Sequence, residues 1–287
     1  MELLDLTSLK TYVSERECDG GGYCFYRLEE PSLADTFYAL ETIKLICSRA
    51  AASNKTLDYV EGFFAQPLRK GFLWGATYAA RILARLDHPI PRKEELKALL
   101  ELYLEWVTDI PATGLAQNIL ELTYATIETL VCVYGCVGKR IAEKLGSSLA
   151  SLESPDGGFG IPPNLTDTFL VVGMLHMLEQ HPKEWEKTVE FVHSCEDEQF
   201  GFTNVPSTKP GFLEGLFYGL SLCDIFHIVP TYKEAAAQFV ISCQTSGGGF
   251  RRASLLGIPT LEYTYMAVCS LALLGVLGQV EPTQKIL

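Results

Sequence analysis

The sequence carries little positive charge and few of the short motifs that mark common enzyme classes. Its 287 residues include 23 Lys and Arg against 35 Asp and Glu, a net charge of −12. The absence of a basic stripe argues against nucleic-acid binding, because such proteins neutralise phosphates with Lys and Arg. The sequence also contains no GxSxG, GxGxxG, P-loop or HExxH, which argues against the hydrolases, nucleotide-binding proteins and zinc proteases that these motifs mark.

Nine cysteines occur without a CxxC pair, and several lie inside apolar runs where a small buried thiol is the ordinary role. The apolar stretch over residues 263–278 is short for a membrane span and indicates a buried helix. The first residues, MELLDLTSLK, contain no basic segment followed by an apolar one. We therefore expect no signal peptide and no transmembrane segment, reduced cysteines and a cytoplasmic location.

What the sequence does contain is a repeat. A glycine followed by an aromatic residue or leucine recurs six times, each time ahead of a long apolar segment, with spacings of 40, 52, 44, 43 and 48 residues. The six marks are Gly22-Tyr23, Gly62-Phe63, Gly114-Leu115, Gly158-Phe159, Gly201-Phe202 and Gly249-Phe250. A period in this range is typical of repeat architectures, in which each unit buries its apolar face against its neighbours.

Each repeat reads as a pair of helices, with a more charged helix before the glycine mark and a more apolar helix after it. Asp35 and Asp167 stand ahead of two of the apolar runs, where an N-capping carboxylate would satisfy free amides. The apolar helices are expected to be inner and the charged helices outer. The prediction is an all-α fold of one domain, residues 1–287, forming an α6–α6 double-layered closed barrel. Its inner helices are predicted near 33–48, 72–87, 115–136, 166–180, 211–227 and 260–278.

The segments SPDGGFG, SCEDEQFGF and SCQTSGGGF, each between an outer and an inner helix, resemble the repeats of protein prenyltransferase β subunits and class II terpene cyclases of the squalene cyclase type. The resemblance covers essentially the whole chain. It implies an α/α-toroid with a central, aromatic-lined cavity that accommodates an isoprenoid chain. It is less specific for function, because functional sites vary on a shared fold.

The chemical motifs of that superfamily are missing. An ungapped placement puts Gly211, Leu213 and Tyr263 where the prenyltransferases have the Asp, Cys and His ligands of zinc, so no metal site and no cofactor are expected. The DxDD acid of the cyclases falls on Ala34 or Thr166, which cannot donate the proton.

Three carboxylates remain as candidate catalytic residues: Glu214, Glu262 and Asp167. Glu214 and Glu262 lie one turn into apolar helices, where a neutral carboxyl group in an apolar cavity would act as a proton donor. The alternative is a favourable first-turn position against the helix dipole. Asp167 has helix capping as its alternative role.

Aromatic side chains on the inner helices have faces that stabilise carbocations. The candidate substrate-binding residues of this kind are Trp74, Tyr124, Tyr218, Tyr263 and Tyr265. Arg81, on an inner helix, is expected either to pair with a carboxylate at the mouth of the barrel or to bind an anionic head group. Arg251 and Arg252 follow the last glycine mark directly and are either diphosphate ligands or exposed loop charges.

Small residues recur among these aromatics and predict an open cavity, so that Gly215→Trp or Gly219→Trp should block a prenyl ligand while leaving stability nearly unchanged. The predicted function is an isoprenoid-handling protein, a divergent terpene cyclase or prenyltransferase-like enzyme with a hydrophobic isoprenoid as ligand. One alternative is a catalytically silent toroid that binds a lipid or a protein partner. A weaker alternative is a carbohydrate-active α/α-toroid that uses Glu214 with Glu262 or Asp167.

Overall fold

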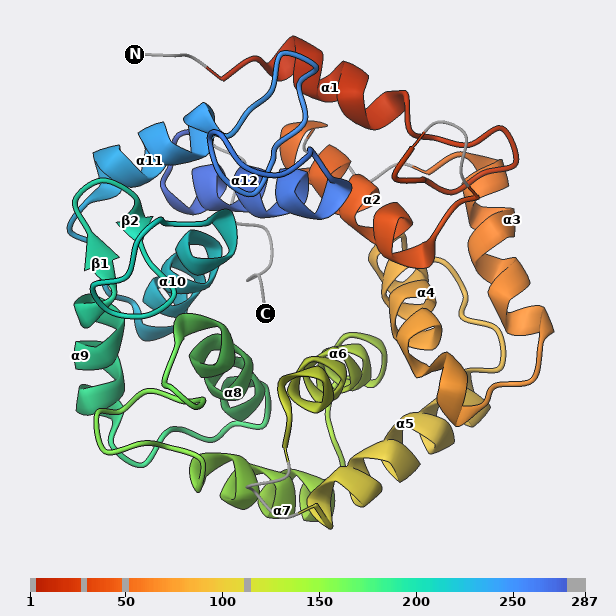
Figure 1. Cartoon of the computed structure of the whole chain (residues 1–287). Helices are drawn as coiled ribbons and strands as arrows, with labels where there is room; N and C mark the ends of the chain where they lie inside the picture. The colour runs from red at the N-terminus through yellow and green to blue at the C-terminus, as the bar shows by residue number, and fades with distance from the viewer. Residues whose placement is uncertain (1–3, 27–29, 48–51, 111–114, 278–287) are drawn as a thin grey trace. The chain divides into compact units, whose positions relative to one another are not determined.

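The computed structural model describes residues 4–26, 30–47, 52–110 and 115–277 (Figure 1). These residues form twelve α-helices, two short 3-10 helices, η1 (Phe63–Ala65) and η2 (Lys70–Phe72), and one hairpin of two-residue strands. The chain divides into two compact units. Unit 1 combines the segment up to Tyr59 with the segment from Val192 onward, and unit 2 runs from Val60 to Phe191.

Unit 1 consists of two layers of helices. Its apolar layer has α12 (Leu261–Leu273) packed between α2 (Leu33–Cys47) and α10 (Leu213–Phe226). α1 (Leu6–Ser14) packs on α2, and α11 (Lys233–Ser242) packs on α12. α3 (Asn54–Gly62) extends into unit 2, and the antiparallel hairpin of β1 (Glu196–Asp197) and β2 (Gly201–Phe202) contacts α10 and α11 through β2.

Unit 2 repeats this arrangement. Its apolar layer has α6 (Gln117–Tyr134) between α4 (Leu73–Arg85) and α8 (Leu165–Met177). α5 (Lys93–Thr108) and α7 (Lys139–Ala150) pack against each other and on α6 and α8. α9 (Trp185–Ser194) follows and ends in unit 1.

The contrast between the two kinds of helix follows from their sequences. α10 buries residues around almost its entire circumference, whereas α7 buries a single stripe formed by Ile141, Leu145, Gly146 and Leu149. A stripe of this kind covers one apolar surface and leaves the opposite face to water. The helix pairs are therefore confirmed, and the predicted inner helices agree with α2, α4, α6, α8, α10 and α12, although residues 48 and 278 lie outside the described residues.

The largest error at a predicted helix end is in the last helix, which ends at Leu273 instead of 278. Gly275 adopts a φ of +73° and its amide bonds the carbonyl of Ala272. A left-handed glycine just beyond the last turn terminates a helix at little steric cost.

The glycine just before the sixth mark allows the backbones of two repeats to approach closely. Gly248 has a φ of +91°, and a Cβ at this position would lie 2.1 Å from the carbonyl oxygen of Ser8 at the start of α1. Gln244 adds two hydrogen bonds of 3.0 Å to the backbone of Asp5. The sixth repeat is thereby joined to the first.

A buried threonine fixes three of the marks to the apolar helix that follows. The amides of the mark aromatics donate to threonine hydroxyls at 2.9, 3.0 and 3.1 Å. The three pairs are Tyr23–Thr36, Phe159–Thr168 and Phe250–Thr264. All six residues are buried, and a buried amide without an acceptor is costly.

We expect Thr36→Val to destabilise the protein by about 1–3 kcal/mol, since the buried amide of Tyr23 loses its acceptor. Thr42→Val, on the same helix, is the matched control. Thr42 is equally buried, but its hydroxyl donates only to the carbonyl of Tyr38 one turn earlier, so its loss should cost less. Equal shifts in the midpoint of urea unfolding for the two variants would contradict the anchoring role of Thr36.

Candidate functional site

An aromatic cluster occupies the apolar layer of unit 1 and involves α2, α10 and α12. Its buried centre is Phe217, Met266 and Cys269, and half-buried side chains pack against that centre. These half-buried residues are Leu45, Tyr218, Tyr263 and Tyr265. Three of the predicted substrate-binding tyrosines therefore lie together on one surface of one unit.

The rings of this cluster contact one another across the helices. The ring centre of Tyr265 lies 5.5 Å from that of Tyr38 and 6.2 Å from that of Phe217, and Phe217 lies 5.3 Å from Tyr218. Offset and edge contacts at these distances are the favourable geometries for aromatic pairs. Tyr38, on α2, thus belongs to the same cluster.

A polar group borders the cluster at the start of α10. One carboxylate oxygen of Glu214, Oε1, lies 2.8 Å from Nε of Arg252 and accepts a hydrogen bond of 3.2 Å from the hydroxyl of Tyr263. The other oxygen, Oε2, is buried and has no hydrogen-bond partner among the described residues. Glu214 therefore links the loop before α12 to a tyrosine of the cluster.

The second predicted carboxylate, Glu262, is exposed and accepts a hydrogen bond of 3.2 Å from the hydroxyl of Tyr38. Glu214 and Glu262 are therefore each bound to a tyrosine of the cluster, at the first turns of the adjacent helices α10 and α12.

Two arginines lie on the loop before α12. The guanidinium carbon of Arg252 stands 4.1 Å from the ring centre of Phe212, and its backbone carbonyl accepts the amide of Leu213. Arg251 is half-buried, and its Nε has no hydrogen-bond partner among the described residues. The sequence identified the arginine pair, but it gave no sign that Arg252 is the partner of Glu214, because 38 positions separate them in the chain.

The remaining predicted residues belong to unit 2. Arg81 is buried and forms an ion pair with Glu128 of α6, whose other oxygen lies 2.8 Å from Arg85. Arg81 is therefore paired, but with Glu128, which is not one of the carboxylates that the sequence placed at the mouth of the barrel. The ring of Tyr124 lies 5.4 Å from that of Phe169. Trp74, at the start of α4, stacks on Tyr78.

The assignment of Asp167 as an N-cap is wrong. Asn164 is the N-cap of α8 and accepts the amide of Asp167, while its own side-chain amide donates to the Asp167 carboxylate at 2.8 Å. Ser32 and Asp35 are related in the same way at the start of α2, with bonds of 2.9 and 2.7 Å. Both aspartates are the third residue of their helix and form a reciprocal cap with the residue that precedes the helix. The sequence predicts each of them at the N-cap itself, three positions earlier in the helix.

The prediction that Gly215 and Gly219 open a cavity is also wrong. A Cβ on Gly215 would lie 2.9 Å from the amide nitrogen of Asn204, and one on Gly219 would lie 2.5 Å from the buried ring of Phe202. These glycines give the loop after the fifth mark room to pack on α10. A tryptophan at either position would disrupt that packing, so it cannot test ligand binding in an intact fold.

Packing also occupies the positions at which the resemblance places zinc ligands. A Cβ on Gly211 would lie 2.4 Å from the ring of Phe200, and the side chain of Leu213 is fully buried. Among the described residues, no three His, Cys, Asp or Glu side chains are grouped so that they could hold a metal ion. Within that same part of the chain, no helix combines the length and apolarity needed to cross a membrane.

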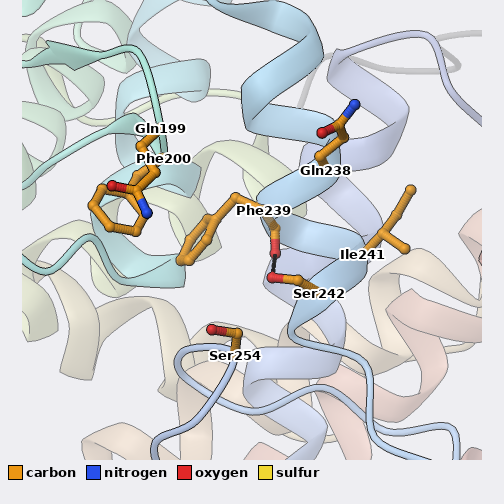
Figure 2. Close-up of a pocket in the computed structure, with 7 residues that line it drawn as sticks. All are labelled: Gln199, Phe200, Gln238, Phe239, Ile241, Ser242 and Ser254. Atoms are coloured by element: carbon orange, nitrogen blue, oxygen red, sulfur yellow. Dashed lines mark hydrogen bonds between the residues drawn. The ribbon is translucent and has the colours of Figure 1, made fainter. Parts of the chain in front are cut away.

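Figure 2 shows a separate pocket of unit 1, of about 350 Å³, beside α11. Phe200 and Phe239 meet edge to face in it, with ring centres 5.3 Å apart, and Ser242 donates to the carbonyl of Phe239. None of the predicted site residues lines this pocket.

The pKa of Tyr263 offers a test of its contact with Glu214. Burial, followed by the charge of Glu214 and its hydrogen bond, raises the pKa of Tyr263 to about 12. Because an unfolded tyrosine has a pKa of about 10, the folded state is favoured at lower pH, and this contribution is lost as the pH rises from about 10 to about 12. We expect Glu214→Gln to lower the pKa of Tyr263. Carbon NMR of Cζ-labelled tyrosine, assigned with Tyr263→Phe, measures the shift, and an unchanged pKa would show that Glu214 is not the partner.

We expect Glu128→Gln to destabilise the protein by about 3–5 kcal/mol, because it breaks the ion pair between Glu128 and the buried Arg81. Glu95→Gln is the control, since the Arg92–Glu95 pair on α5 is more exposed and such pairs contribute at most about 1 kcal/mol. Urea unfolding compares the two. A loss for Glu128→Gln no greater than that of the control would argue against a buried ion pair.

Comparison with known proteins identifies the family to which this fold belongs. Residues 1–211 and 212–286 match the family model of the prenyltransferase alpha-alpha toroid domain. No curated protein sequence matches the chain. Among solved structures, the chain is similar to one described as Candida albicans protein geranylgeranyltransferase-I complexed with GGPP, with a TM-score of 0.63 and 15% sequence identity over 95% of this chain and 92% of that chain. An identity this low carries the fold alone. The resemblance predicted from the glycine marks is confirmed: the chain belongs to the family of prenyltransferase alpha-alpha toroid domains, and its fold class is the all-α toroid.

Proposed function

We propose that the chain is an isoprenoid-binding protein, with its residues 1–287 acting as one prenyltransferase-like toroid domain in the cytoplasm. The observation that supports the proposal is the aromatic cluster of unit 1 with the Glu214–Arg252 pair at its edge. An isoprenoid diphosphate has the matching chemistry, namely an unsaturated apolar chain with an anionic end. The similar solved structure is complexed with GGPP.

The tyrosine rings are suited to the chain part of such a ligand. Tyr218, Tyr263 and Tyr265 are only half-buried, so each has apolar surface that a ligand can remove from water. Burial of apolar surface contributes about 25 cal/mol per Å². The same ring faces would stabilise an allylic cation if the diphosphate departs, which is the chemistry of a divergent transferase or cyclase.

The arginines are suited to the head group. Arg252 contacts Glu214 through Nε, and its two terminal nitrogens make no hydrogen bond or ion pair within the described part of the chain. A guanidinium presents paired donors that match phosphate oxygens, and Arg251 lies next to it in the sequence. Glu214 then positions Arg252 as its anionic partner. Because Glu214 forms this ion pair with Arg252, it does not suit the predicted role of proton donor.

The test is calorimetric titration of the purified chain with geranylgeranyl diphosphate and with geranylgeraniol, which has the same chain without the diphosphate. We expect Tyr265→Ala to weaken the binding of both ligands about tenfold, a loss of about 1.4 kcal/mol. Arg252→Gln should weaken only the diphosphate. Tyr232→Ala is the control, because Tyr232 is exposed beside α11 and lies outside the cluster.

Two outcomes would count against the proposal. If Tyr265→Ala and Tyr232→Ala bind the ligands equally well, the cluster is not the binding surface. If the wild-type protein binds neither ligand, the silent scaffold becomes the better interpretation.

A further inference from the structure

Unit 2 contains a pocket of about 490 Å³ that the proposed isoprenoid function does not use. It lies among η2, α4, α5 and α6, and its walls come from all four elements. The lining residues are Lys70, Leu73, Trp74, Tyr103, Trp106, Asn118, Ile119 and Leu122. A volume in this range, with mostly apolar walls and few polar groups, is typical of small-molecule sites.

Two of the chain's three tryptophans line this one pocket. Trp74 is 41% exposed and Trp106 is 48% exposed, an unusual amount of indole surface to leave in water. Large aromatic surfaces gathered at one place mark binding sites, whereas single exposed apolar residues need no explanation.

The aromatic walls are held in place before any ligand arrives. The ring centre of Trp106 lies 5.7 Å from that of Tyr103, whose hydroxyl is within hydrogen-bonding distance of Thr123 at 3.3 Å. Trp74 stacks on Tyr78 with ring centres 6.3 Å apart. Side chains fixed in this way lose little further entropy on binding.

The charge at the rim sets the polarity of the ligand. Lys70 is the one charged side chain among the lining residues, and the described part of the chain gives it no ion pair. Asn118 supplies an exposed, neutral amide. An ammonium group at the edge of an apolar aromatic pocket favours a ligand with one negative group.

We propose that this pocket binds a small, flat, apolar molecule with a single anionic group. The ring system of the ligand stacks against Trp106 and Trp74, and its anionic group pairs with Lys70. The site is distinct in residues and in chemistry from the tyrosine cluster of unit 1.

The experiment uses two probes with the same ring system. 8-Anilinonaphthalene-1-sulfonate carries a negative group, and N-phenyl-1-naphthylamine lacks it. We expect Trp106→Ala to weaken the binding of both probes about tenfold. Lys70→Gln should weaken the sulfonate several-fold and leave the uncharged amine unchanged. Fluorescence titration measures both affinities, and circular dichroism with a thermal melt checks that each variant is folded.

Trp185→Phe and Leu102→Ala are the controls. Trp185 is the third tryptophan, Leu102 is an exposed residue of α5, and neither lines the pocket. The proposal is overturned if Trp106→Ala binds the sulfonate as tightly as these controls do. If Lys70→Gln weakens the two probes equally, Lys70 does not pair with the anionic group of the ligand, and that part of the proposal is overturned. Displacement of the probe by geranylgeraniol, with loss of probe binding in Tyr265→Ala, would place the probe at the tyrosine cluster instead.

Discussion

A hydrogen bond from a glycine-loop amide to a threonine hydroxyl recurs at three of the repeats. It fixes how the loop sits on the apolar helix that follows, and with it the side chains at the start of that helix. It ties the aromatic residue of the mark to the first turn of the following apolar helix, as in Phe250 and Thr264. The threonine in turn donates to the carbonyl of Thr260 one turn earlier, so one hydroxyl joins the loop and the helix start. Residues next to that threonine, such as Tyr263 and Tyr265, are thereby placed on the surface of α12 that meets the aromatic cluster.

The anchoring threonine also explains a partial motif. The sequence keeps an Asp-Thr pair at residues 35–36 and 167–168 while losing the acid that a cyclase would use. In the structure, Thr36 and Thr168 accept loop amides, and Asp35 and Asp167 take part in reciprocal caps. These two pairs therefore have a structural role that requires no catalysis.

Periodicity made the helices and their pairing predictable, because every repeat must bury one apolar surface. The direction in which a small residue points was not predictable. Gly215 and Gly219 lie among aromatics in the sequence but contact the loop behind α10, since that loop approaches the helix too closely for a Cβ. The partners in ion pairs were also not predictable from the sequence. Arg81 pairs with Glu128, 47 positions away, and nothing local to either residue specifies the other. Of the aromatic residues singled out in the sequence, Tyr218, Tyr263 and Tyr265 lie in the cluster, whereas Trp74 and Tyr124 belong to unit 2. The polar edge of the cluster depends on a loop whose path the sequence does not encode in any short pattern.

The contact between the sixth mark and α1 has a consequence for the order of folding. Unit 2 is a continuous stretch, so its local contacts can form as soon as it has been synthesised. Unit 1 is assembled from two stretches separated by more than 130 residues, and Ser8 can meet Gly248 only after the residues between them have been synthesised. Long-range closures of this kind slow folding and leave early segments exposed. α1 and α2 can pack on each other early, but they lack their contacts with α12 and the sixth mark until that later stretch is made, and we expect a chaperone to hold them in the interval.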